Sequence, residues 1–305
     1  MLFLEEDQVR ERLRLEELIP AIEQALTAYS TGRVRQPLRT ILAIEEHHAF
    51  FAAMPAVYED ILGAKLVCVF PGNAARGLHT HLAMIQLFRA DTGEPLAMMD
   101  GRLITELRTA AVSAVATKTL APQATPVLAI LGSGVQARAH LRALRLVRHF
   151  EEVRVWSRTA AHAARLAEDA GAKAVSSPEA AVRDADVVVT VTNSSVPVVE
   201  GTWLKAGAYV NAVGAVGPTR RELDEITMRS GPVVVESREA ALRESGEIVI
   251  PQVPVYAELG EILAGKKAAP GATGSPNVVF KSTGIAVEDL AAARLVYQKH
   301  SANRK

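Results

Sequence analysis

The stretch V-L-A-I-L-G-S-G-V-Q-A (residues 127–137) decides the fold of this chain. Its first five residues are apolar and predict a strand that is buried on both faces. The pattern G-x-G-x-x-A follows: Gly132 allows a tight turn, Gly134 lets the backbone approach a pyrophosphate, and Ala137 lets the next helix pack closely. Because the start of that helix offers N–H groups to an anion, the segment predicts a dinucleotide site. The alternative is a glycine turn that joins strand and helix and binds no ligand.

The sequence after this stretch repeats the same alternation of apolar strands and helices. Continuous β-branched runs occupy residues 153–157, 185–192 and 208–214, and helical segments lie between them. One of these segments, S-S-P-E-A-A-V (residues 176–182), starts with a serine cap and a proline at the first helical position. Strands buried on both faces and alternating with helices predict an α/β fold with a Rossmann-type doubly wound parallel sheet. We assign this dinucleotide-binding domain to residues 121–285.

The end of the second predicted strand indicates which dinucleotide is bound. Folds of this kind usually carry an acidic side chain there, which accepts hydrogen bonds from a ribose 2′-hydroxyl. Here Ser157, Arg158 and Thr159 stand at that place, 25 residues beyond Gly132. An arginine offers a planar fork to a 2′-phosphate, and the two hydroxyls can donate to it. We therefore predict NADP(H) over NAD(H); the alternative is that Arg158 is a surface cation that caps the next helix.

The nicotinamide end is expected at two further strand ends. Thr192 closes V-V-V-T-V-T and Val213 lies in N-A-V-G-A. In an open parallel sheet the carboxyl ends of the strands face the ligand, so both residues are expected to line the nicotinamide side. The predicted cofactor-binding residues are Gly132, Gly134, Val135, Gln136, Ser157, Arg158, Thr159, Thr192 and Val213.

The first 120 residues read differently. Helical spacing over residues 5–30 precedes several short apolar runs, and the glycine-containing connection 90–94 joins two of them as a hairpin. We expect an antiparallel sheet with one or two helices on it, followed by a helix over Glu106–Leu120. The segment 286–305 reads as an amphipathic helix that returns to this α+β domain, which we assign to residues 1–120.

Composition excludes several classes of protein. The 34 Lys and Arg residues balance 34 Asp and Glu residues, which argues against a nucleic-acid or membrane partner held by bulk charge. Cys68 is the single cysteine, so no intrachain disulfide forms and a reducing compartment is expected. We expect that the N-terminus is not a signal peptide, and no apolar run approaches the roughly 20 residues of a membrane helix. We expect a cytoplasmic protein.

Taken together, these stretches resemble the ornithine cyclodeaminase/mu-crystallin family over nearly the whole chain. The R-T-A-A-x-S-A segment is the most specific of them, and W-S-R-T is similar to the W-N-R-T of the mu-crystallin branch, whose members use NADPH. The matching stretches are R-Q-P-L-R-T (35–40), G-A-K-L-V (63–67), M-D-G-R-L-I-T (99–105), L-R-T-A-A-V-S-A-V-A-T-K (107–118), L-G-S-G-V-Q-A (131–137), N-A-V-G-A (211–215), R-E-L-D (221–224) and F-K-S-T-G-I-A-V-E-D (280–289).

The resemblance implies a Rossmann domain plus a substrate domain that dimerises through its sheet, so we expect a homodimer. Members of the family act on amino acids and their imines. They include cyclodeaminases, ketimine or cyclic-imine reductases, and alanine dehydrogenase-like enzymes.

The resemblance also implies a substrate site. Arg39 and Arg108, which opens a helix of small residues, would hold the substrate α-carboxylate, because two forks suit one carboxylate. The alternative is that these arginines bridge internal acids such as Glu106 or Asp100. Lys65, the only lysine before Lys118, would face the reacting centre, and a buried lysine can exchange a proton near neutrality. The alternative is a lysine that extends from a strand end to solvent.

Two histidines form H-x-H on a predicted strand, so His79 and His81 are expected to point to one face. Two ligands are too few for a closed zinc site, and no third ligand is obvious nearby, so we predict no metal. By resemblance to the mu-crystallin branch, His81 has a polar role near the substrate or the nicotinamide.

Two departures from the family pattern point to the reaction. By resemblance, cyclodeaminases carry an aspartate after N-A-V-G where Val216 stands, and a glutamate where Ala52 stands. A valine cannot accept a proton, so ornithine cyclisation is disfavoured, and Val216 would instead line the substrate.

The favoured hypothesis is an oxidoreductase that reduces a small α-imino acid with NADPH, such as a pyrroline- or piperideine-2-carboxylate. Lys65, Arg39 and Arg108 are the predicted catalytic residues, and His81 and Val216 complete the predicted substrate site. An ornithine cyclodeaminase or an alanine dehydrogenase-like enzyme is the first alternative. The second is an NADPH-dependent small-molecule binding protein without chemistry.

Overall fold

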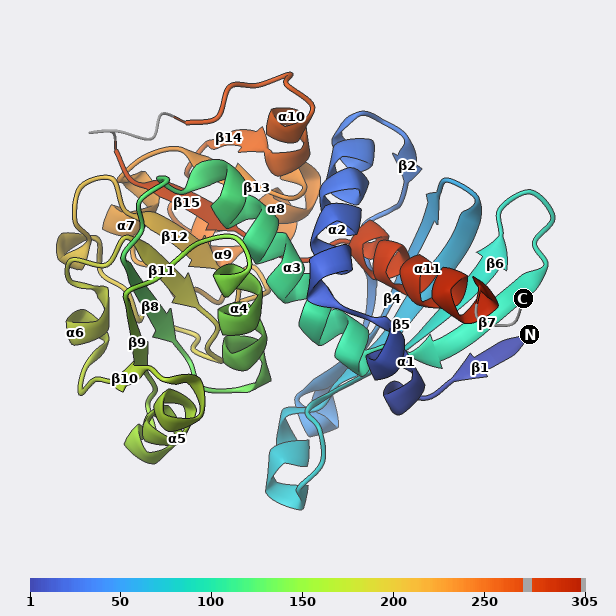
Figure 1. Ribbon diagram of the computed structural model, residues 1–305, viewed down its shortest axis with the longest axis horizontal. Helices are drawn as coiled ribbons and strands as arrows, with labels where there is room; N and C mark the ends of the chain where they lie inside the picture. The colour runs from blue at the N-terminus through green and yellow to red at the C-terminus, as the bar shows by residue number, and fades with distance from the viewer. Residues whose placement is uncertain (271–275, 303–305) are drawn as a thin grey trace. The chain divides into compact units, whose positions relative to one another are not determined.

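The structure is a computed structural model that describes residues 1–270 and 276–302. The chain forms two compact units: unit 1 contains residues 1–112 and 284–305, and unit 2 contains residues 113–283. Figure 1 shows the elements of both. In the described ranges, no helix combines the length and the apolar character that crossing a membrane requires.

Unit 2 is built on an eight-stranded sheet in which every pairing is parallel. The strands run in the order β10-β9-β8-β11-β12-β15-β13-β14. They are β8 (Val127–Leu131), β9 (Glu152–Trp156), β10 (Lys173–Ala174), β11 (Val187–Thr190), β12 (Tyr209–Ala212), β13 (Val233–Val235), β14 (Val255–Glu258) and β15 (Val278–Lys281). The predicted doubly wound parallel sheet is confirmed.

The strand order reverses at β8. From β8 the chain continues outward through β9 and β10 on one side and then resumes at β11 and β12 on the other. Such a reversal leaves a crevice beyond the carboxyl ends of β8 and β11, where open α/β sheets bind their ligands.

Helices connect these strands. In α6, Ser177 caps the helix by accepting a hydrogen bond from the Ala180 N–H at 3.0 Å, as its sequence predicts. The helices are α4 (Val135–Arg145), α5 (Ala160–Ala170), α6 (Pro178–Val182), α7 (Glu225–Arg229), α8 (Arg238–Glu244), α9 (Gly246–Val249) and α10 (Leu259–Leu263), with a 3-10 turn η3 (Gly201–Trp203).

Unit 1 holds a seven-stranded sheet of order β1-β7-β6-β5-β4-β2, with β3 paired to β4. The strands are β1 (Leu2–Leu4), β2 (Val34–Arg35), β3 (Thr40–Ile44), β4 (Ala49–Tyr58), β5 (Ile61–Val69), β6 (His81–Arg89) and β7 (Pro95–Asp100). The expectation of a purely antiparallel sheet is wrong in one place, because β1 pairs parallel to β7. This edge strand has three residues; Leu4 is buried and Phe3 is exposed.

One face of this sheet is covered by helices. The C-terminal helix α11 (Ala286–Ala302) packs on α2 (Leu15–Ser30) and on β4, β5 and β6 (Figure 1). The expectation that this helix is amphipathic is wrong for its first half, since residues 286–293 are all buried. A helix buried all round needs no polar stripe. The remaining helical elements are α1 (Glu6–Arg12), α3 (Arg102–Leu120), η1 (Glu45–His47) and η2 (Pro71–Arg76).

The helix α3 begins four residues before the predicted start at Glu106. Arg108 is therefore the seventh residue of α3, and the expectation that it opens the helix is wrong. The helix is buried along nearly all its length, because its Ala, Ser and Thr side chains are small enough to allow close packing on every side.

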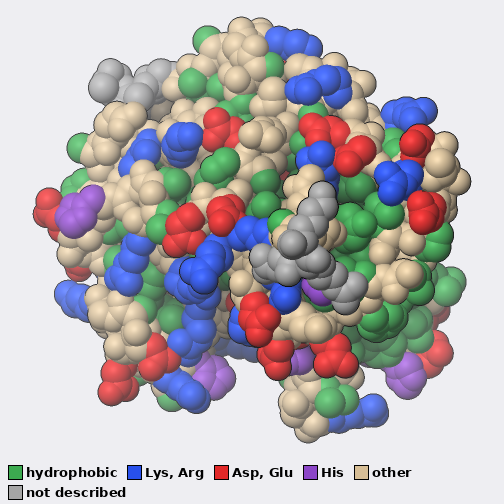
Figure 2. All heavy atoms as spheres, turned by 45° about the vertical axis from the view of Figure 1, so that its right-hand side comes forward, with side chains coloured by type: hydrophobic (Ala, Val, Ile, Leu, Met, Phe, Trp, Pro, Cys, Tyr) green, Lys and Arg blue, Asp and Glu red, His purple; other side chains and the backbone are tan. Residues whose placement is uncertain are grey.

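Charged side chains of both signs are interspersed over the face of the molecule in Figure 2. This distribution agrees with a formal net charge of zero.

Candidate functional site

Five ionisable side chains meet inside unit 1, and we call them the charge cluster: Arg39, Lys65, Arg108, Glu288 and Asp289. Lys65 from β5 places Nζ 2.7 Å from Oδ2 of Asp289. Arg108 from α3 donates from Nη1 to Oε2 of Glu288 at 2.6 Å and from Nε to Oδ1 of Asp289 at 3.0 Å. The two carboxylates come from the first turn of α11 and are fully buried. Internal acids therefore hold both Lys65 and Arg108.

Gly284 lies between the two arginines. Its carbonyl accepts a hydrogen bond from Nη2 of Arg39 at 2.6 Å. Its φ is +74°, a left-handed conformation that favours glycine. A Cβ at this position would also lie 2.7 Å from Nη1 of Arg108, so a side chain would displace the guanidinium. The glycine therefore lets the backbone pass directly beside Arg108.

Burial sets the ionisation of this cluster. Burial lowers the pKa of Lys65 to about 8, although the charge of Asp289 opposes this shift. Burial acts to raise the pKa of Asp289, but the charges of Arg108 and Lys65 lower it below its usual value. Burial, together with the charges of Lys65 and Arg108, lowers the pKa of His81 to about 4. At neutral pH the carboxylate is therefore ionised, Lys65 is mostly protonated and His81 is neutral.

The cluster brings three cationic side chains of unit 1 close together, Arg39, Lys65 and Arg108. Lys65 and Arg108 are buried, and Arg39 is partly buried. Two guanidinium groups beside Gly284 and a neighbouring ammonium are suited to binding a carboxylate.

The structure brings together four of the predicted substrate-site residues, Arg39, Lys65, His81 and Arg108. The alternative that the arginines pair with internal acids holds for Arg108, whose partners include Glu288 and Asp289. Of the two acids that we considered, Glu106 pairs with Arg102, and the Asp100 carboxylate accepts a hydrogen bond from the Arg102 N–H. The fifth predicted residue, Val216, lies in unit 2 on the loop after β12 and is 38 % exposed. Its contact with substrate stays a prediction.

One geometric expectation is wrong. The strand β6 begins at His81, so His79 lies in the preceding loop, where it is exposed. The two histidines therefore do not share a strand face. Over residues 1–270 and 276–302, no three His, Cys, Asp or Glu side chains gather as a metal site.

The glycine-rich turn of unit 2 has the form that a pyrophosphate requires. Gly132 has a φ of +123°, and a Cβ there would lie 2.6 Å from the Val191 carbonyl oxygen, so only glycine fits. A Cβ at Gly134 would meet no atom within 4 Å, so the space beside it is open. Gly134 is also the N-cap of α4 and has no side chain to cap the N–H groups of that helix. These groups fit the pyrophosphate of a nicotinamide dinucleotide.

The S-R-T segment follows β9 directly and adjoins this turn. Ser133 Oγ donates to Ser157 Oγ at 2.9 Å and so ties the turn to the end of β9. Thr159 occupies the N-cap position of α5, where its side chain makes no capping hydrogen bond. Arg158 is exposed, and no carboxylate pairs with it in the described part of the chain.

Thr192 and Val213 follow β11 and β12 within two residues, at the carboxyl edge of the sheet. Val213 is 8 % exposed, and Thr192 donates both its N–H and its hydroxyl to Oε1 of Glu222, at 2.7 and 2.6 Å. They stand at the strand ends where we predict the nicotinamide.

The fold agrees with comparisons to known proteins. The sequence profile of the ornithine cyclodeaminase/mu-crystallin family matches residues 1–304. The chain belongs to this family. It is 44 % identical to the ketimine reductase mu-crystallin of Mus musculus, covering 99 % of this chain and 98 % of the relative. It is 36 % identical to a Δ1-pyrroline-2-carboxylate reductase of Bacillus cereus, covering 98 % and 96 %.

A solved structure is also close to this one. The Δ1-pyrroline-2-carboxylate reductase of Thermococcus litoralis, in complex with NADH and L-proline, has a TM-score of 0.95. It is 37 % identical and covers 99 % of this chain and 98 % of its own. This chain is therefore an oxidoreductase with a nucleotide-binding Rossmann fold.

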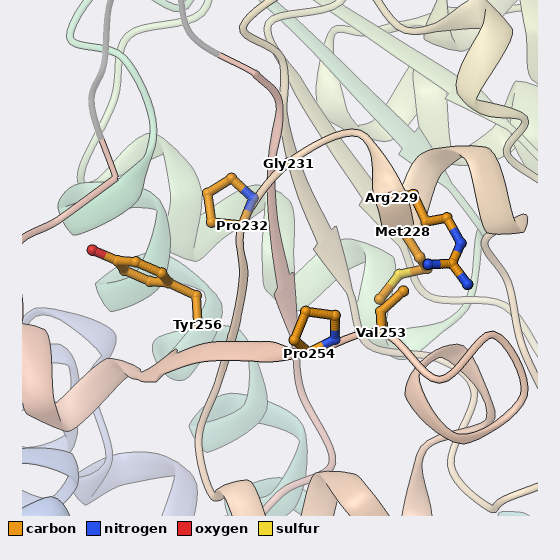
Figure 3. A pocket seen from close by; sticks show the side chains of 7 residues that line it. All are labelled: Met228, Arg229, Gly231, Pro232, Val253, Pro254 and Tyr256. Carbon is orange, nitrogen blue, oxygen red and sulfur yellow. The ribbon is translucent and has the colours of Figure 1, made fainter.

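A surface pocket of about 380 Å³ lies elsewhere in unit 2 (Figure 3). Gly231 and Pro232 precede β13, and Val253 and Pro254 precede β14, so the pocket adjoins the amino ends of these strands. Ligands of parallel sheets bind at the opposite, carboxyl ends. We therefore do not assign this pocket to the cofactor.

Sequence reasoning missed the acidic half of the charge cluster. In the sequence, Glu288 and Asp289 look like ordinary acids in the first turn of a helix, where a negative charge interacts favourably with the helix dipole. The signal was their position before a run of small apolar residues in V-E-D-L-A-A-A. Reasoning also missed the buried ions of unit 2, Glu222, Glu247 and Lys281. Two of these lie in R-E-L-D and F-K-S-T-G, which we used only for the family resemblance.

Proposed function

We propose that the protein reduces a small α-imino acid, cyclic or open-chain, to the amino acid with a nicotinamide cofactor, and that the cofactor is NADPH. The single observation that supports the substrate class is the convergence of Arg39, Lys65 and Arg108 in the charge cluster, because two guanidinium groups and an ammonium suit one carboxylate. The mouse relative is named a ketimine reductase and the Bacillus relative a Δ1-pyrroline-2-carboxylate reductase, which also supports imine reduction.

In this proposal the arginines bind and orient the substrate carboxylate. Arg39 is anchored by Gly284 and Arg108 by two buried acids, so neither guanidinium has to be ordered when substrate arrives. Preorganised forks fix the direction of a carboxylate as well as its charge. Fixing one end of a small planar molecule in this way also fixes its C=N bond, and such positioning lowers the barrier by several kcal/mol.

Lys65 supplies the proton. The ammonium at Nζ, with a pKa of about 8, is mostly charged at neutrality and yet gives up a proton readily. It would protonate the imine nitrogen, while the bound nicotinamide supplies the hydride to the imine carbon. The contact between Lys65 and Asp289 keeps Nζ in one place before and after that transfer.

The choice of NADPH is supported by the end of β9. No acid stands there to repel a 2′-phosphate, and the exposed Arg158 can reach one from the solvent side. The Thermococcus relative was solved with NADH, so the coenzyme of this chain needs its own test. Arg158→Ala should weaken NADPH binding about tenfold, as loss of a charge-assisted pair of hydrogen bonds would, and leave NADH binding unchanged. Arg165→Ala, which removes an exposed arginine from α5, is the matched control.

The departures at Val216 and Ala52 support reduction over cyclisation. Ala52 is fully buried on β4, and Val216 offers no proton acceptor. Neither position can activate a substrate amine.

The test is a spectrophotometric screen for oxidation of NADPH and NADH. The substrates are Δ1-pyrroline-2-carboxylate, Δ1-piperideine-2-carboxylate and an open-chain α-imino acid, with ornithine and alanine tested in the presence of the oxidised cofactors. Reduction of an imine supports the proposal. Ammonia and proline from ornithine would identify a cyclodeaminase, NAD(P)H formed with alanine a dehydrogenase, and tight binding without turnover a binding protein.

Arg39→Met tests the role of the charge cluster in the same assay. It should raise the KM for the imine about 100-fold, a loss of roughly 3 kcal/mol that is typical of a removed charge-assisted contact. Arg35→Met removes an exposed arginine from β2 and should leave the KM unchanged.

We further propose a homodimer formed through the outer face of the unit 1 sheet. On this face Leu42, Phe51, Cys68 and Leu82 stand opposite one another on neighbouring strands. Leu66 and Met84 form the next row; Leu42 is 64 %, Leu82 44 %, Met84 43 % and Leu66 40 % exposed. A continuous apolar face of this kind usually marks an interface. Light scattering should give the mass of a dimer, and Leu82→Asp should yield the monomer.

A further inference from the structure

The buried carboxylate of Glu222 joins two loops at the carboxyl edge of the unit 2 sheet. Its Oε1 accepts hydrogen bonds from the N–H and the hydroxyl of Thr192, on the loop after β11, at 2.7 and 2.6 Å. Its Oε2 accepts from the N–H groups of Gly214 and Ala215, on the loop after β12, at 2.7 and 3.2 Å. The side chain has no exposed surface. One carboxylate therefore sets the distance between two loops that follow adjacent strands.

The rest of Glu222 is held in place as well. Its N–H donates to Oε1 of Glu247 at 2.9 Å, and its carbonyl accepts from the N–H groups of Val198 and Val199. The buried Lys281 completes the second loop, since Nζ donates to the Ala215 carbonyl at 2.5 Å and lies 3.4 Å from Glu247. The carboxylate is thus mounted on a rigid support.

The close approach of the two loops depends on a glycine. A Cβ at Gly214 would lie 2.5 Å from the Thr192 nitrogen and 2.6 Å from Oε1 of Glu222. The glycine-rich turn after β8 is packed by Val191, whose carbonyl oxygen would lie 2.6 Å from a Cβ at Gly132. The hydrogen bonds of the Glu222 carboxylate go instead to the loops after β11 and β12.

We propose that Glu222 is a positioning residue for the nicotinamide half of the dinucleotide: its carboxylate fixes the loops that carry Thr192 and Val213. This inference rests on the proposed function. A group that no ligand touches can act in this way because binding to preformed loops costs less ordering than binding to mobile ones. The adenosine half binds at the ends of β8 and β9, which Glu222 does not contact, so its affinity should not depend on this carboxylate.

The experiment compares the whole dinucleotide with its adenosine end. Binding of NADPH and of adenosine 2′,5′-bisphosphate is measured by calorimetry for the native protein and for Glu222→Gln. The glutamine keeps the size of the side chain, but its amide nitrogen can accept no hydrogen bond and so must oppose the donors of one loop. We expect the Kd for NADPH to rise at least tenfold and the Kd for the fragment to change less than twofold. Glu236→Gln, at a buried acid that accepts hydrogen bonds from Ser282 and Thr283, is the matched control.

A second route to the same change guards against a variant that does not fold. Gly214→Ala places a methyl group against Oε1 of Glu222 and should produce the same split between dinucleotide and fragment. Unchanged NADPH affinity in folded Glu222→Gln or Gly214→Ala would overturn the inference, as would an equal loss for both ligands. If the native protein bound neither NADPH nor NADH, the proposed function itself would fail, and the native measurement alone would show it.

Discussion

In unit 1, the buried carboxylates of Glu288 and Asp289 pair with the side-chain cations Lys65 and Arg108. In unit 2, the buried carboxylate of Glu222 accepts hydrogen bonds from three backbone N–H groups and a hydroxyl. The lysine of unit 2, Lys281, lies 3.4 Å from Glu247.

This difference separates two uses of buried charge. Backbone N–H groups are fixed by the fold, so an acid that they satisfy can hold loops in place but recruits no ligand. Cations that acids hold in place are preorganised, and a carboxylate ligand can bind to such groups. The first arrangement shapes a site, and we propose that the second binds substrate.

The largest expected effect is on the stability of the charge cluster. Arg108→Met leaves Glu288 and Asp289 buried without their shared partner, so the free energy of unfolding should fall by about 3–5 kcal/mol. Lys281→Met should cost less, because Glu247 keeps the Glu222 N–H and the Ser245 hydroxyl as donors. Urea unfolding of both variants measures which one loses more of the free energy of unfolding.

Arg138→Met is the control for that series. Arg138 pairs with Asp169 at the surface, where both side chains are more than 40 % exposed, so the change should be about 0.5 kcal/mol. A loss for Lys281→Met as large as that for Arg108→Met would contradict the distinction between the two clusters.

The next effect is a dependence of catalysis on alkaline pH. If Lys65 donates the proton, kcat/KM for imine reduction should fall as pH rises through about 8, where the Nζ group loses its charge. Lys65→Arg, which stays charged, should move that fall to higher pH at a lower overall rate. A profile with the same midpoint in both proteins would assign the fall to another group, such as the substrate.

Deprotonation of Lys65 should lower kcat/KM as pH rises, but it should raise the free energy of unfolding. The folded pKa of Lys65 is below the ordinary value of 10.5, so between pH 8 and 10.5 the unfolded chain binds more protons than the folded one. This group therefore raises the free energy of unfolding as pH increases through that window, and its penalty is complete below pH 8. Urea unfolding of the native protein and of Lys65→Met, compared across this window, measures the contribution.

The smallest effect concerns a buried histidine of unit 2. The Gln136 carbonyl can only accept, so His140 donates to it from Nδ1 at 2.8 Å, and Nε2 accepts from the Ser113 hydroxyl at 2.9 Å. Burial lowers the pKa of His140 to about 4 from 6.5. As pH falls through this interval the unfolded chain binds more protons, so stability is lost.

His140→Asn should remove about one proton from the pH dependence of unfolding between pH 4 and 6.5 and leave kcat/KM at neutral pH unchanged. His162→Asn, at an exposed position of α5, is the control and should not change that dependence. A slope unchanged in His140→Asn would mean that the ring titrates normally in the folded protein.

Local features of the chain were predicted well from the sequence. The turn at Gly132, the serine cap at Ser177 and the parallel sheet follow from patterns of a few residues, and the structure has all three. Errors arose at the ends of elements: β6 begins after His79, and α3 begins before the predicted start, so Arg108 lies inside the helix. The strand β1 was too short to give a periodic signal.

The sequence alone determined which residue types this protein has available for its chemistry: a phosphate turn, an arginine in place of an acid after β9, and one lysine in an apolar strand. These are local properties, because backbone conformation and hydrophobic period depend on near neighbours. Only the tertiary structure decided the partners of Arg108, since Glu288 and Asp289 stand about 180 positions further along the chain. Packing of α11 against the sheet brings these groups together, and no local spacing in the sequence encodes a pairing between residues so far apart.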